Sequence, residues 1–282
     1  MKTGIVGLGA MGQGMARRLA TAGYLSAVYN RTVSKAQKLA DELHVTCCLS
    51  PEELAAQVDL ILICVSADHD VLEMIAAISK TVKPGSIVVD LSTVSRDTAL
   101  TAAAMLAEKQ VDFLDAPVSG GVEGAKNGTL SMMVGGEASI LERVRPVLET
   151  MAARITHMGA TGAGQATKAV NQIMCAGINQ AVTEALAFAR AQGLPMEKVI
   201  EVTSAGAAGN WFLERRGLTM TNGTFTPGFK VALHYKDLKI CQAMADKLNV
   251  FIPVTTMTIA NYAELMAEGH GDEDISGLFR LK

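Results

Sequence analysis

The chain has 282 residues, of which 49% are hydrophobic and 19% are charged, and its net charge is -3. This length exceeds that of one ordinary domain, so we expect two domains, each large enough to bury a core. The charged residues form neither the basic stripe that binds nucleic acid nor an acidic tail. No uninterrupted apolar stretch reaches the roughly 20 residues of a membrane helix.

The N-terminus lacks the patterns of signal and transit peptides, so we expect a cytoplasmic protein. The five cysteines form no Cys-x-x-Cys pair and are expected to be small buried hydrophobes. The five dispersed histidines have no spacing that could close a metal site, so no metal is expected.

Residues 1–160 alternate short β-branched runs with helical stretches, which predicts a parallel sheet covered by helices on both faces. Strands are expected at residues 3–6, 25–29, 46–48, 60–65, 87–90, 113–116, 130–134 and 155–157. Helices are expected at 11–22, 34–43, 69–79, 96–108 and 140–151. The predicted fold class is α/β, with an N-terminal Rossmann-type doubly wound sheet.

The strand pattern ends after Gly159. Residues from about 163 to 192 contain no proline and predict a helix of roughly 45 Å, long enough to bridge two domains. Further helices are expected at 196–204, 211–221, 235–248 and 253–268. We therefore predict a cofactor-binding domain at 1–160 and an all-α substrate and oligomerisation domain at 161–282. Trp211 is expected to lie in its core, with the wall of a substrate pocket as the alternative.

A glycine-rich turn, Gly7-Leu8-Gly9-Ala10-Met11-Gly12, follows the first strand and opens the first helix. In this context Gly9 lets backbone approach a pyrophosphate, and Gly12 lets the helix pack close to the sheet. The start of the helix offers amide donors and a positive dipole end. The turn predicts dinucleotide binding, and an ordinary tight turn is the alternative.

The second strand ends at Asn30-Arg31-Thr32, where NAD enzymes usually carry an acid for the ribose 2′-hydroxyl. An acid would repel a 2′-phosphate, whereas a guanidinium flanked by two hydrogen-bonding side chains would bind it. NADP(H) is therefore the preferred cofactor. NAD(H) remains possible, because Arg31 could instead lie along the adenine.

Lys168 lies near the start of the long helix, at the expected cleft between the domains. Most helix lysines are solvated surface charges, but here Ala166 and Ala169 are apolar neighbours, and Asn171 and Gln172 follow on the same face. Desolvation lowers the pKa of a lysine. Such a lysine could give a proton to a carbonyl oxygen as hydride arrives.

The carboxyl edge of the sheet carries the other candidate residues, because ligands of open α/β sheets bind there. Ser119, Gly120 and Gly121 follow the strand at 113–116 and could bind a carboxylate through their amides and a hydroxyl, with a plain turn as the alternative. Ser92 and Thr93 could line the nicotinamide pocket, and we assign Val65 and Ser66 to the cofactor site as well.

Together these residues resemble the four motifs of the β-hydroxyacid dehydrogenase family, and the resemblance covers nearly the whole chain. Its motifs are the turn at 7–12, the segment 115–121 continuing into 128–130 and 134–136, the segment 162–172, and Lys236-Asp237-Leu238. The resemblance implies that Lys168 is the proton donor or acceptor, and that Ser119, Gly120 and Gly121 hold the substrate carboxylate.

The resemblance also implies roles for the remaining site residues. Asn171 and Gln172 would orient the substrate, and Lys236 and Thr93 would contact the nicotinamide. Phe229 and Asp237 match positions that shape the closed site in glyoxylate and succinic semialdehyde reductases of the family. A surface carboxylate paired with a neighbouring lysine is the alternative for Asp237.

Within the family the chain resembles the tartronate semialdehyde reductases at 119–121, 168–172 and 227–229. Its tail, 274–278, departs from their usual Asp-His-Ser-Ala-Leu, and Asn30-Arg31-Thr32 matches the NADP-using semialdehyde and glyoxylate reductases. The implied reaction is hydride transfer between NADP(H) and a short β-hydroxyacid or its semialdehyde, with tartronate semialdehyde, succinic semialdehyde or glyoxylate reduced.

Two other functions stay open. One is an NAD-dependent 3-hydroxyisobutyrate dehydrogenase, and the other is a non-catalytic dinucleotide-binding interaction module. The expected partners are a small carboxylate-bearing aldehyde or hydroxyacid and further copies of the chain in a homodimer or homotetramer. Nucleic acid and membrane are not expected partners.

Overall fold

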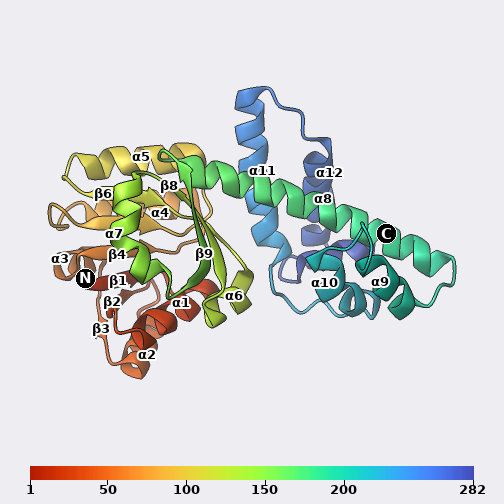
Figure 1. Cartoon of the computed structure of the whole chain (residues 1–282), viewed down its shortest axis with the longest axis horizontal. Coiled ribbons are helices and arrows are strands. Elements are labelled where there is room, and N and C mark those ends of the chain that lie inside the picture. The colour runs from red at the N-terminus through yellow and green to blue at the C-terminus, as the bar shows by residue number, and fades with distance from the viewer. The chain divides into compact units, whose positions relative to one another are not determined.

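The computed structural model describes residues 1–282, which divide into two compact units, Met1–Lys168 and Ala169–Lys282 (Figure 1). The first unit is built on a sheet and the second is helical. The predicted fold class, α/β with a Rossmann-type sheet followed by an all-α part, is confirmed.

A nine-stranded sheet forms the centre of the first unit, with strand order β3-β2-β1-β4-β5-β6-β8-β7 and β9 paired to β8. Its first six strands have the 3-2-1-4-5-6 order of a doubly wound dinucleotide fold. The strands are β1 Thr3–Val6, β2 Leu25–Tyr29, β3 Thr46–Cys47, β4 Leu60–Ile63, β5 Ile87–Asp90, β6 Asp112–Asp115, β7 Val118–Ser119, β8 Leu130–Gly135 and β9 Ala152–Gly159.

Helices cover both faces of this sheet. They are α1 Ala10–Thr21, α2 Val33–Leu43, α3 Pro51–Gln57, α4 Asp68–Ile78, α5 Arg96–Ala107, α6 Gly121–Asn127 and α7 Ala138–Leu148. Helices α1, α2, α6 and α7 bury their apolar residues in one core, and α3, α4 and α5 bury theirs in another. Successive strand residues point to opposite faces, so Leu60 and Leu62 enter the first core and Ile61 and Ile63 the second.

The sheet differs from the predicted parallel arrangement at one edge, where β8 runs antiparallel to β6 and β7. The connection between β7 and β8, residues 120–129, is shorter than the dozen or more residues of a parallel crossover. The two short elements in this region, β7 and α6, were not predicted. Helix α6 contains Gly121 and Gly124, and glycine has a low helix propensity.

Helix α8, Ala163–Ala191, is a single uninterrupted helix over almost the predicted span. The boundary between the two compact units falls within it, after Lys168. The other helices of the second unit are α9 Met196–Ser204, α10 Trp211–Thr221, α11 Val231–Leu248, α12 Pro253–Ala267 and the 3₁₀ helix η1 Ile275–Leu281.

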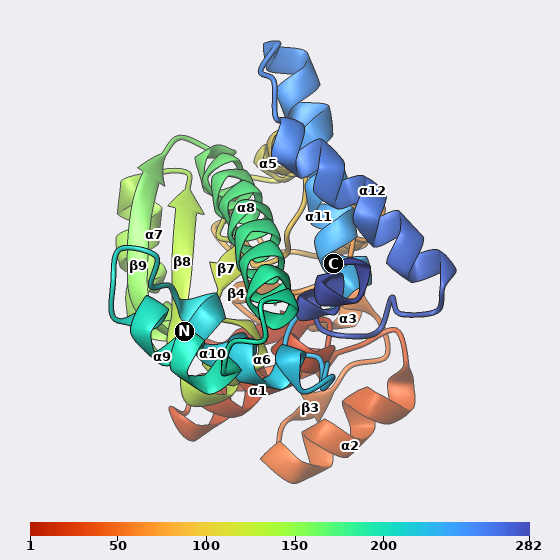
Figure 2. The same ribbon diagram turned by 90° about the vertical axis from the view of Figure 1, so that its right-hand side faces the viewer.

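The helical unit has one core of its own, to which α8, α10, α11, α12 and η1 contribute buried side chains. Helices α11 and α12 lie side by side (Figure 2). Tyr262 of α12 and Leu278 of η1 are fully buried there. Helix α9 has no buried residue, although Met196, Val199 and Ile200 pack against the core.

Two expectations about burial need correction. Trp211 is 60% exposed at the first position of α10, so its assignment to the core was wrong. The guanidinium of Arg216 lies 5.6 Å from the centroid of the Trp211 ring.

The cysteines were expected to be buried, and this holds for two of the five. Cys48 and Cys241 are buried, whereas Cys47, Cys64 and Cys175 are partly exposed. None of the helices combines the length and apolarity needed to span a bilayer.

Candidate active site

The glycine turn leaves the start of α1 open. Gly7 has a φ of +93°, and a Cβ there would overlap the carbonyl oxygen of Cys64. A Cβ on Gly12 would overlap the carbonyl oxygen of Gly7, so only glycine allows α1 to approach β1 this closely. A Cβ on Gly9, in contrast, would meet nothing within 4 Å. This open space at a helix N-terminus fits the pyrophosphate of a dinucleotide.

The start of α1 has no side chain that caps it. Gly9 is the N-cap of α1 and makes no side-chain capping bond, and the first turn of the helix carries no acid. The Asn30 side chain fixes the turn from the end of β2, because its Oδ1 accepts from the Leu8 amide at 2.9 Å. Asn30 also donates to the carbonyl of Thr32 at 3.1 Å. It therefore connects the glycine turn to the segment that follows β2.

Arg31 extends into solvent, with 84% of its side chain exposed. Its Nη1 lies 3.4 Å from Oδ1 of Asp70, in the first turn of α4. The Nε2 of His69 is also 3.4 Å from the same Asp70 oxygen. Asp70, whose side chain is only 14% exposed, was not identified from the sequence, because it lies 39 residues from Arg31.

The loops after β4 and β5 are joined to each other at the carboxyl edge of the sheet. The Val65 amide donates to Oγ of Ser92 at 3.0 Å, and the Ser92 amide donates to Oδ1 of Asp90 at 2.9 Å. Ser66 is exposed and Thr93 is partly buried. The structure thus brings together the two segments that were assigned to the cofactor site from different parts of the sequence.

Cys64 lies directly before this loop and beside the glycine turn. Desolvation of the Cys64 thiol and, to a lesser extent, the nearby Asp90 carboxylate together raise its pKa to about 12. At neutral pH this thiol is therefore protonated, and it is a poor nucleophile.

Lys168 is 7% exposed, and its Nζ donates to the carbonyl oxygen of Val118 at 2.9 Å. The interpretation of Lys168 as a solvated surface charge is therefore wrong. Val118 directly precedes Ser119, Gly120 and Gly121. Gly120, with a φ of +129°, is the N-cap of α6, and Gly121 has a φ of +62°. The predicted proton-transfer lysine and the predicted carboxylate-binding segment are neighbours in the sheet unit.

Within the helical unit, Gln172 and Asp237 form a buried pair. Gln172 donates through Nε2 to Oδ2 of Asp237 at 2.6 Å, and the two residues are 1% and 5% exposed. Asn171 donates to Oε1 of Gln172 at 2.8 Å, and Lys236 lies 2.9 Å from Oδ1 of Asp237. Asp237 is paired with the neighbouring lysine, as one alternative expected, but it is buried rather than on the surface.

A second buried group, absent from the predicted site, supports this pair. His234 is fully buried, and its ring nitrogens contact the Tyr262 hydroxyl at 3.1 Å and the carbonyl of Gln172 at 3.2 Å. Phe229 lies against it, with the ring centroids 5.2 Å apart. Burial raises the pKa of the Tyr262 hydroxyl far above its usual range. The partners of His234 lie 28 and 62 residues away, so no local pattern in the sequence could have signalled this group.

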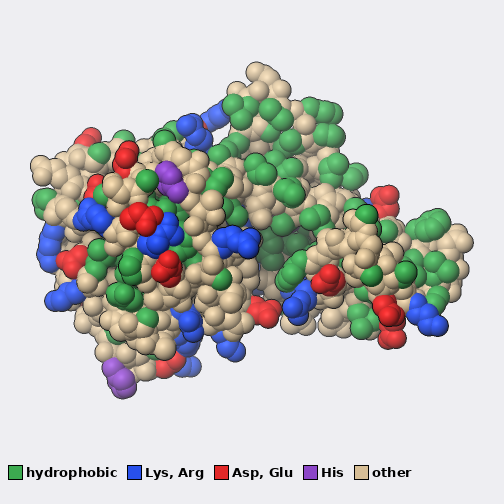
Figure 3. Space-filling model, viewed as in Figure 1, with side chains coloured by type: hydrophobic (Ala, Val, Ile, Leu, Met, Phe, Trp, Pro, Cys, Tyr) green, Lys and Arg blue, Asp and Glu red, His purple; other side chains and the backbone are tan.

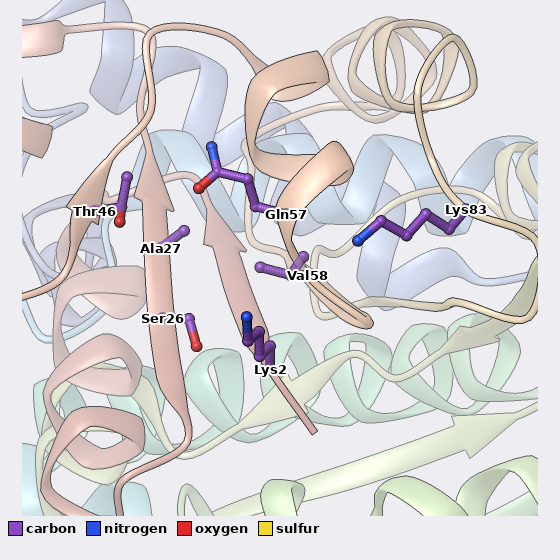
Figure 4. Close-up of a pocket in the computed structure, with 7 residues that line it drawn as sticks. All are labelled: Lys2, Ser26, Ala27, Thr46, Gln57, Val58 and Lys83. Carbon is purple, nitrogen blue, oxygen red and sulfur yellow. The ribbon is translucent and has the colours of Figure 1, made fainter.

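The cavity drawn in Figure 4 has a volume of about 370 Å³. It lies near the amino ends of β1 and β2, whereas the glycine turn follows the carboxyl end of β1. It contains none of the predicted site residues. Its lining consists of Lys2, Ser26, Ala27, Thr46, Gln57, Val58 and Lys83. No cluster of three or more His, Cys, Asp or Glu side chains in the chain could hold a metal ion.

Comparisons with known proteins agree with this arrangement. A family model described as the NAD binding domain of 6-phosphogluconate dehydrogenase matches residues 2–159. A second, described as NAD-binding of NADP-dependent 3-hydroxyisobutyrate dehydrogenase, matches residues 162–282. Together the two matches cover both structural units and account for almost every residue.

Three relatives illustrate the range of similar proteins. The 2-hydroxy-3-oxopropionate reductase of Escherichia coli is 37% identical, over 99% of this chain and 96% of its own. The NAD-dependent L-serine dehydrogenase of Pseudomonas aeruginosa is 32% identical, over 98% of this chain and 96% of its own. A solved structure of 3-hydroxyisobutyrate dehydrogenase from Mycobacterium tuberculosis with L-serine is 31% identical, has a TM-score of 0.90, and covers 99% of this chain and 98% of its own.

The glycine turn fits a nicotinamide dinucleotide, a buried lysine lies beside a small-residue segment, and the likeness extends over the full length. The chain belongs to the β-hydroxyacid dehydrogenase family, whose members include the 3-hydroxyisobutyrate dehydrogenases, and it is an NAD(P)-dependent oxidoreductase acting on CH–OH groups.

Proposed function

We propose that the protein transfers hydride reversibly between NADP(H) and a short β-hydroxyacid or its semialdehyde, and that it reduces tartronate semialdehyde, succinic semialdehyde or glyoxylate. The observation that carries this proposal is the contact between Lys168 and Val118, which holds a buried ammonium beside Ser119. Tartronate semialdehyde is 2-hydroxy-3-oxopropionate, the compound named for the E. coli relative.

The roles of the substrate-binding residues follow from their chemistry. The amides of Gly120 and Gly121 and the Ser119 hydroxyl bind the substrate carboxylate. Lys168 donates a proton to the carbonyl oxygen while hydride reaches the carbonyl carbon, and a hydroxyl group results. In the oxidative direction Lys168 accepts that proton. Asn171 and Gln172, which follow Lys168 by one helical turn, orient the substrate.

The dinucleotide supplies or accepts the hydride, and several parts of the chain bind it. The turn from Gly7 to Gly12 holds the pyrophosphate, and Asn30, Arg31 and Thr32 hold the 2′-phosphate. The other residues assigned to the cofactor are Val65, Ser66, Thr93, Phe229 and Lys236, of which Thr93 and Lys236 contact the nicotinamide. Asp237, through its bonds to Gln172 and Lys236, keeps these two side chains in a fixed relation.

The choice of NADP(H) rests on the end of β2, where no acid follows Tyr29 and the exposed Arg31 can reach a phosphate. An NAD-dependent 3-hydroxyisobutyrate dehydrogenase is the second candidate, and the serine dehydrogenase from P. aeruginosa, named as NAD-dependent, favours it. Initial rates with NADPH and NADH over a panel of semialdehydes, glyoxylate and 3-hydroxyisobutyrate separate the two. A strong preference for NADH would overturn the cofactor assignment.

The Lys168→Ala variant tests the chemistry. Because it removes the proton donor, we expect kcat to fall about 10²- to 10⁴-fold while the Kd for NADPH stays within about twofold. Steady-state kinetics and fluorescence titration measure the two quantities. Lys126→Ala, on the exposed side of α6, is the control and should retain wild-type kinetics.

Retained turnover in Lys168→Ala would remove the lysine from the mechanism. A wild-type protein that binds NADPH but reduces none of the panel would instead support a non-catalytic dinucleotide-binding module.

We also propose that the protein is a homodimer or homotetramer. Hydrophobic side chains gather over the helical unit on the face in view, whereas charged side chains are concentrated on the sheet unit (Figure 3). Exposed large hydrophobics of the helical unit include Met174, Phe188, Val202, Trp211, Leu248, Val250 and Phe251. Apolar patches of this kind are typical of surfaces that other protein chains cover.

A further inference from the structure

Asp115, at the end of β6, is a fully buried carboxylate that contacts the start of α8. Its Oδ1 accepts from the Gly162 amide at 2.7 Å, and its Oδ2 accepts from the Gln165 amide at 2.8 Å. Helix α8 has no acid of its own in the first turn. Asp115 therefore caps the helix from another strand and places a negative charge at its positive end.

Two glycines make room for this carboxylate. A Cβ on Gly135 would lie 2.5 Å from Oδ1 of Asp115 and 2.9 Å from the Ala163 amide nitrogen. A Cβ on Gly164 would overlap the carbonyl oxygen of Met133 and lie 2.8 Å from Oδ2 of Asp115. Only glycine at both positions lets β6, β8 and the first turn of α8 approach closely enough for these hydrogen bonds to form.

Gln165 fixes the same helical turn at a second point. Its side chain is 1% exposed, donates through Nε2 to the Ser92 carbonyl at 2.8 Å, and accepts through Oε1 from the Val94 amide at 3.2 Å. These two backbone groups flank Thr93. The start of α8 is thus tied both to β6 and to the loop that follows β5.

Lys168 stands three residues beyond Gln165 on the same helix. Side chains three apart share a face, whereas a slip of one residue turns a side chain by about 100° around the axis. The bonds of Asp115 and Gln165 therefore determine whether Nζ of Lys168 reaches the Val118 carbonyl. Without them, the first turn of α8 could fray or rotate, as helix ends do when they lose their caps.

We propose that Asp115 and Gln165 are positioning residues for Lys168, which hold its ammonium in a fixed place relative to Ser119 and Thr93. This inference rests on the proposed function, in which Lys168 transfers the proton. It assigns a role to the first residue of the segment 115–121 that is distinct from substrate binding, since Asp115 is fully buried and its oxygens are occupied by backbone amides.

The chemistry of the cap demands a carboxylate. Both contacts are amide donors, so both side-chain oxygens must accept, and an asparagine would turn an NH₂ group towards one of the donors. Burial raises the pKa of Asp115, while amide donors from Gly162, Gln165 and Gly164 oppose that shift. Asparagine, the neutral side chain of the same shape, has a single acceptor oxygen and cannot accept from both amides through separate atoms as Asp115 does.

The test compares Asp115→Asn with Asp112→Asn, the same substitution at the exposed start of the same strand, where Asp112 pairs with Arg143. Because misplacing a catalytic group by about 1 Å can cost 10²-fold, we expect kcat of Asp115→Asn to fall by about that factor. The Kd for NADPH should stay within about twofold, and the limb of the kcat/KM pH profile that requires Lys168 should shift. Asp112→Asn should match the wild type in all three.

Gln165→Glu provides a second, independent variant, because it keeps the side-chain length but removes the donor to the Ser92 carbonyl. Gln165→Glu should lower kcat and leave the Kd for NADPH unchanged. If Asp115→Asn fails to fold, this variant alone tests whether the start of α8 positions Lys168. Wild-type kcat and pH profiles in both folded variants, with activity lost in Lys168→Ala, would overturn the positioning roles alone. Full activity in Lys168→Ala would overturn the proposed function instead.

Discussion

Asn30 shows how one side chain can serve two segments. Its position after β2 predicted a contact with the 2′-phosphate, but its Oδ1 accepts from the Leu8 amide and its Nδ2 donates one hydrogen to the Thr32 carbonyl. These two hydrogen bonds hold the glycine turn next to the segment that contains Arg31. The second Nδ2 hydrogen of Asn30 can still donate to a 2′-phosphate, beside Arg31 and Thr32.

The Arg31→Ala variant tests that reading. We expect the Kd for NADPH to rise about 10- to 150-fold, because charge-assisted hydrogen bonds contribute roughly 1.5–3 kcal/mol, and the Kd for NADH to change little. Titration of both nucleotides measures the difference. Arg143→Ala, which removes an exposed guanidinium from α7, is the control. Equal losses for NADPH and NADH would mean that Arg31 does not contact the 2′-phosphate.

Trp211 and Asp237 show where residue types mislead. A lone tryptophan suggests a core position, yet Trp211 begins α10 and remains mostly exposed beside Arg216. A helix carboxylate next to a lysine suggests a surface pair, yet Asp237 is buried against Gln172. Burial depends on which face of a helix is covered, and no composition rule supplies that face.

At the scale of elements, the regular helices and strands of the sheet unit were predictable because their cause is local. The continuous apolar run of β4 and the uninterrupted length of α8 are visible as patterns in the sequence. The elements α3, β7, α6 and η1 were not among the predicted helices and strands. Each is short, and each is held by neighbours distant in sequence, as when Val118 pairs with Met132 of β8.

Two glycines of α8 should respond in opposite ways to alanine. Gly177→Ala places its methyl group in open space and should raise the free energy of unfolding by about 1 kcal/mol through helix propensity. Gly164→Ala presses a methyl group on the Met133 carbonyl and should lower that free energy by about 1–3 kcal/mol. Urea unfolding measures both. An unchanged or more stable Gly164→Ala would contradict the close packing of α8 against β8.

At the scale of the whole molecule, the chain consists of two compact units with different surfaces. The sheet unit has two cores enclosed by helices, whereas the helical unit has one core and many exposed hydrophobic side chains. A monomer seldom leaves so much apolar surface in water. The exposed hydrophobic side chains therefore predict that the protein associates with further copies of itself.

We expect light scattering to give a mass above that of one 29.6 kDa chain at micromolar concentration. Phe251→Ser removes the most exposed of the large hydrophobics, at 87%, and should shift dissociation to higher protein concentration. Leu49→Ser, at a residue 69% exposed on the sheet unit, is the control and should not. A monomeric wild type would contradict the proposed assembly.

The sequence by itself determined the glycine turn, the positions of the main strands along the chain, the long helix and the family. Each of these depends on a local pattern or on motifs in a fixed order. The tertiary structure alone decided what surrounds the predicted residues. Asp115 meets residues 47 and 50 positions away, and Arg31 meets an acid 39 positions away. Such contacts arise only when the sheet aligns its strand ends, and periodicity along one element does not reveal which partner each side chain will find.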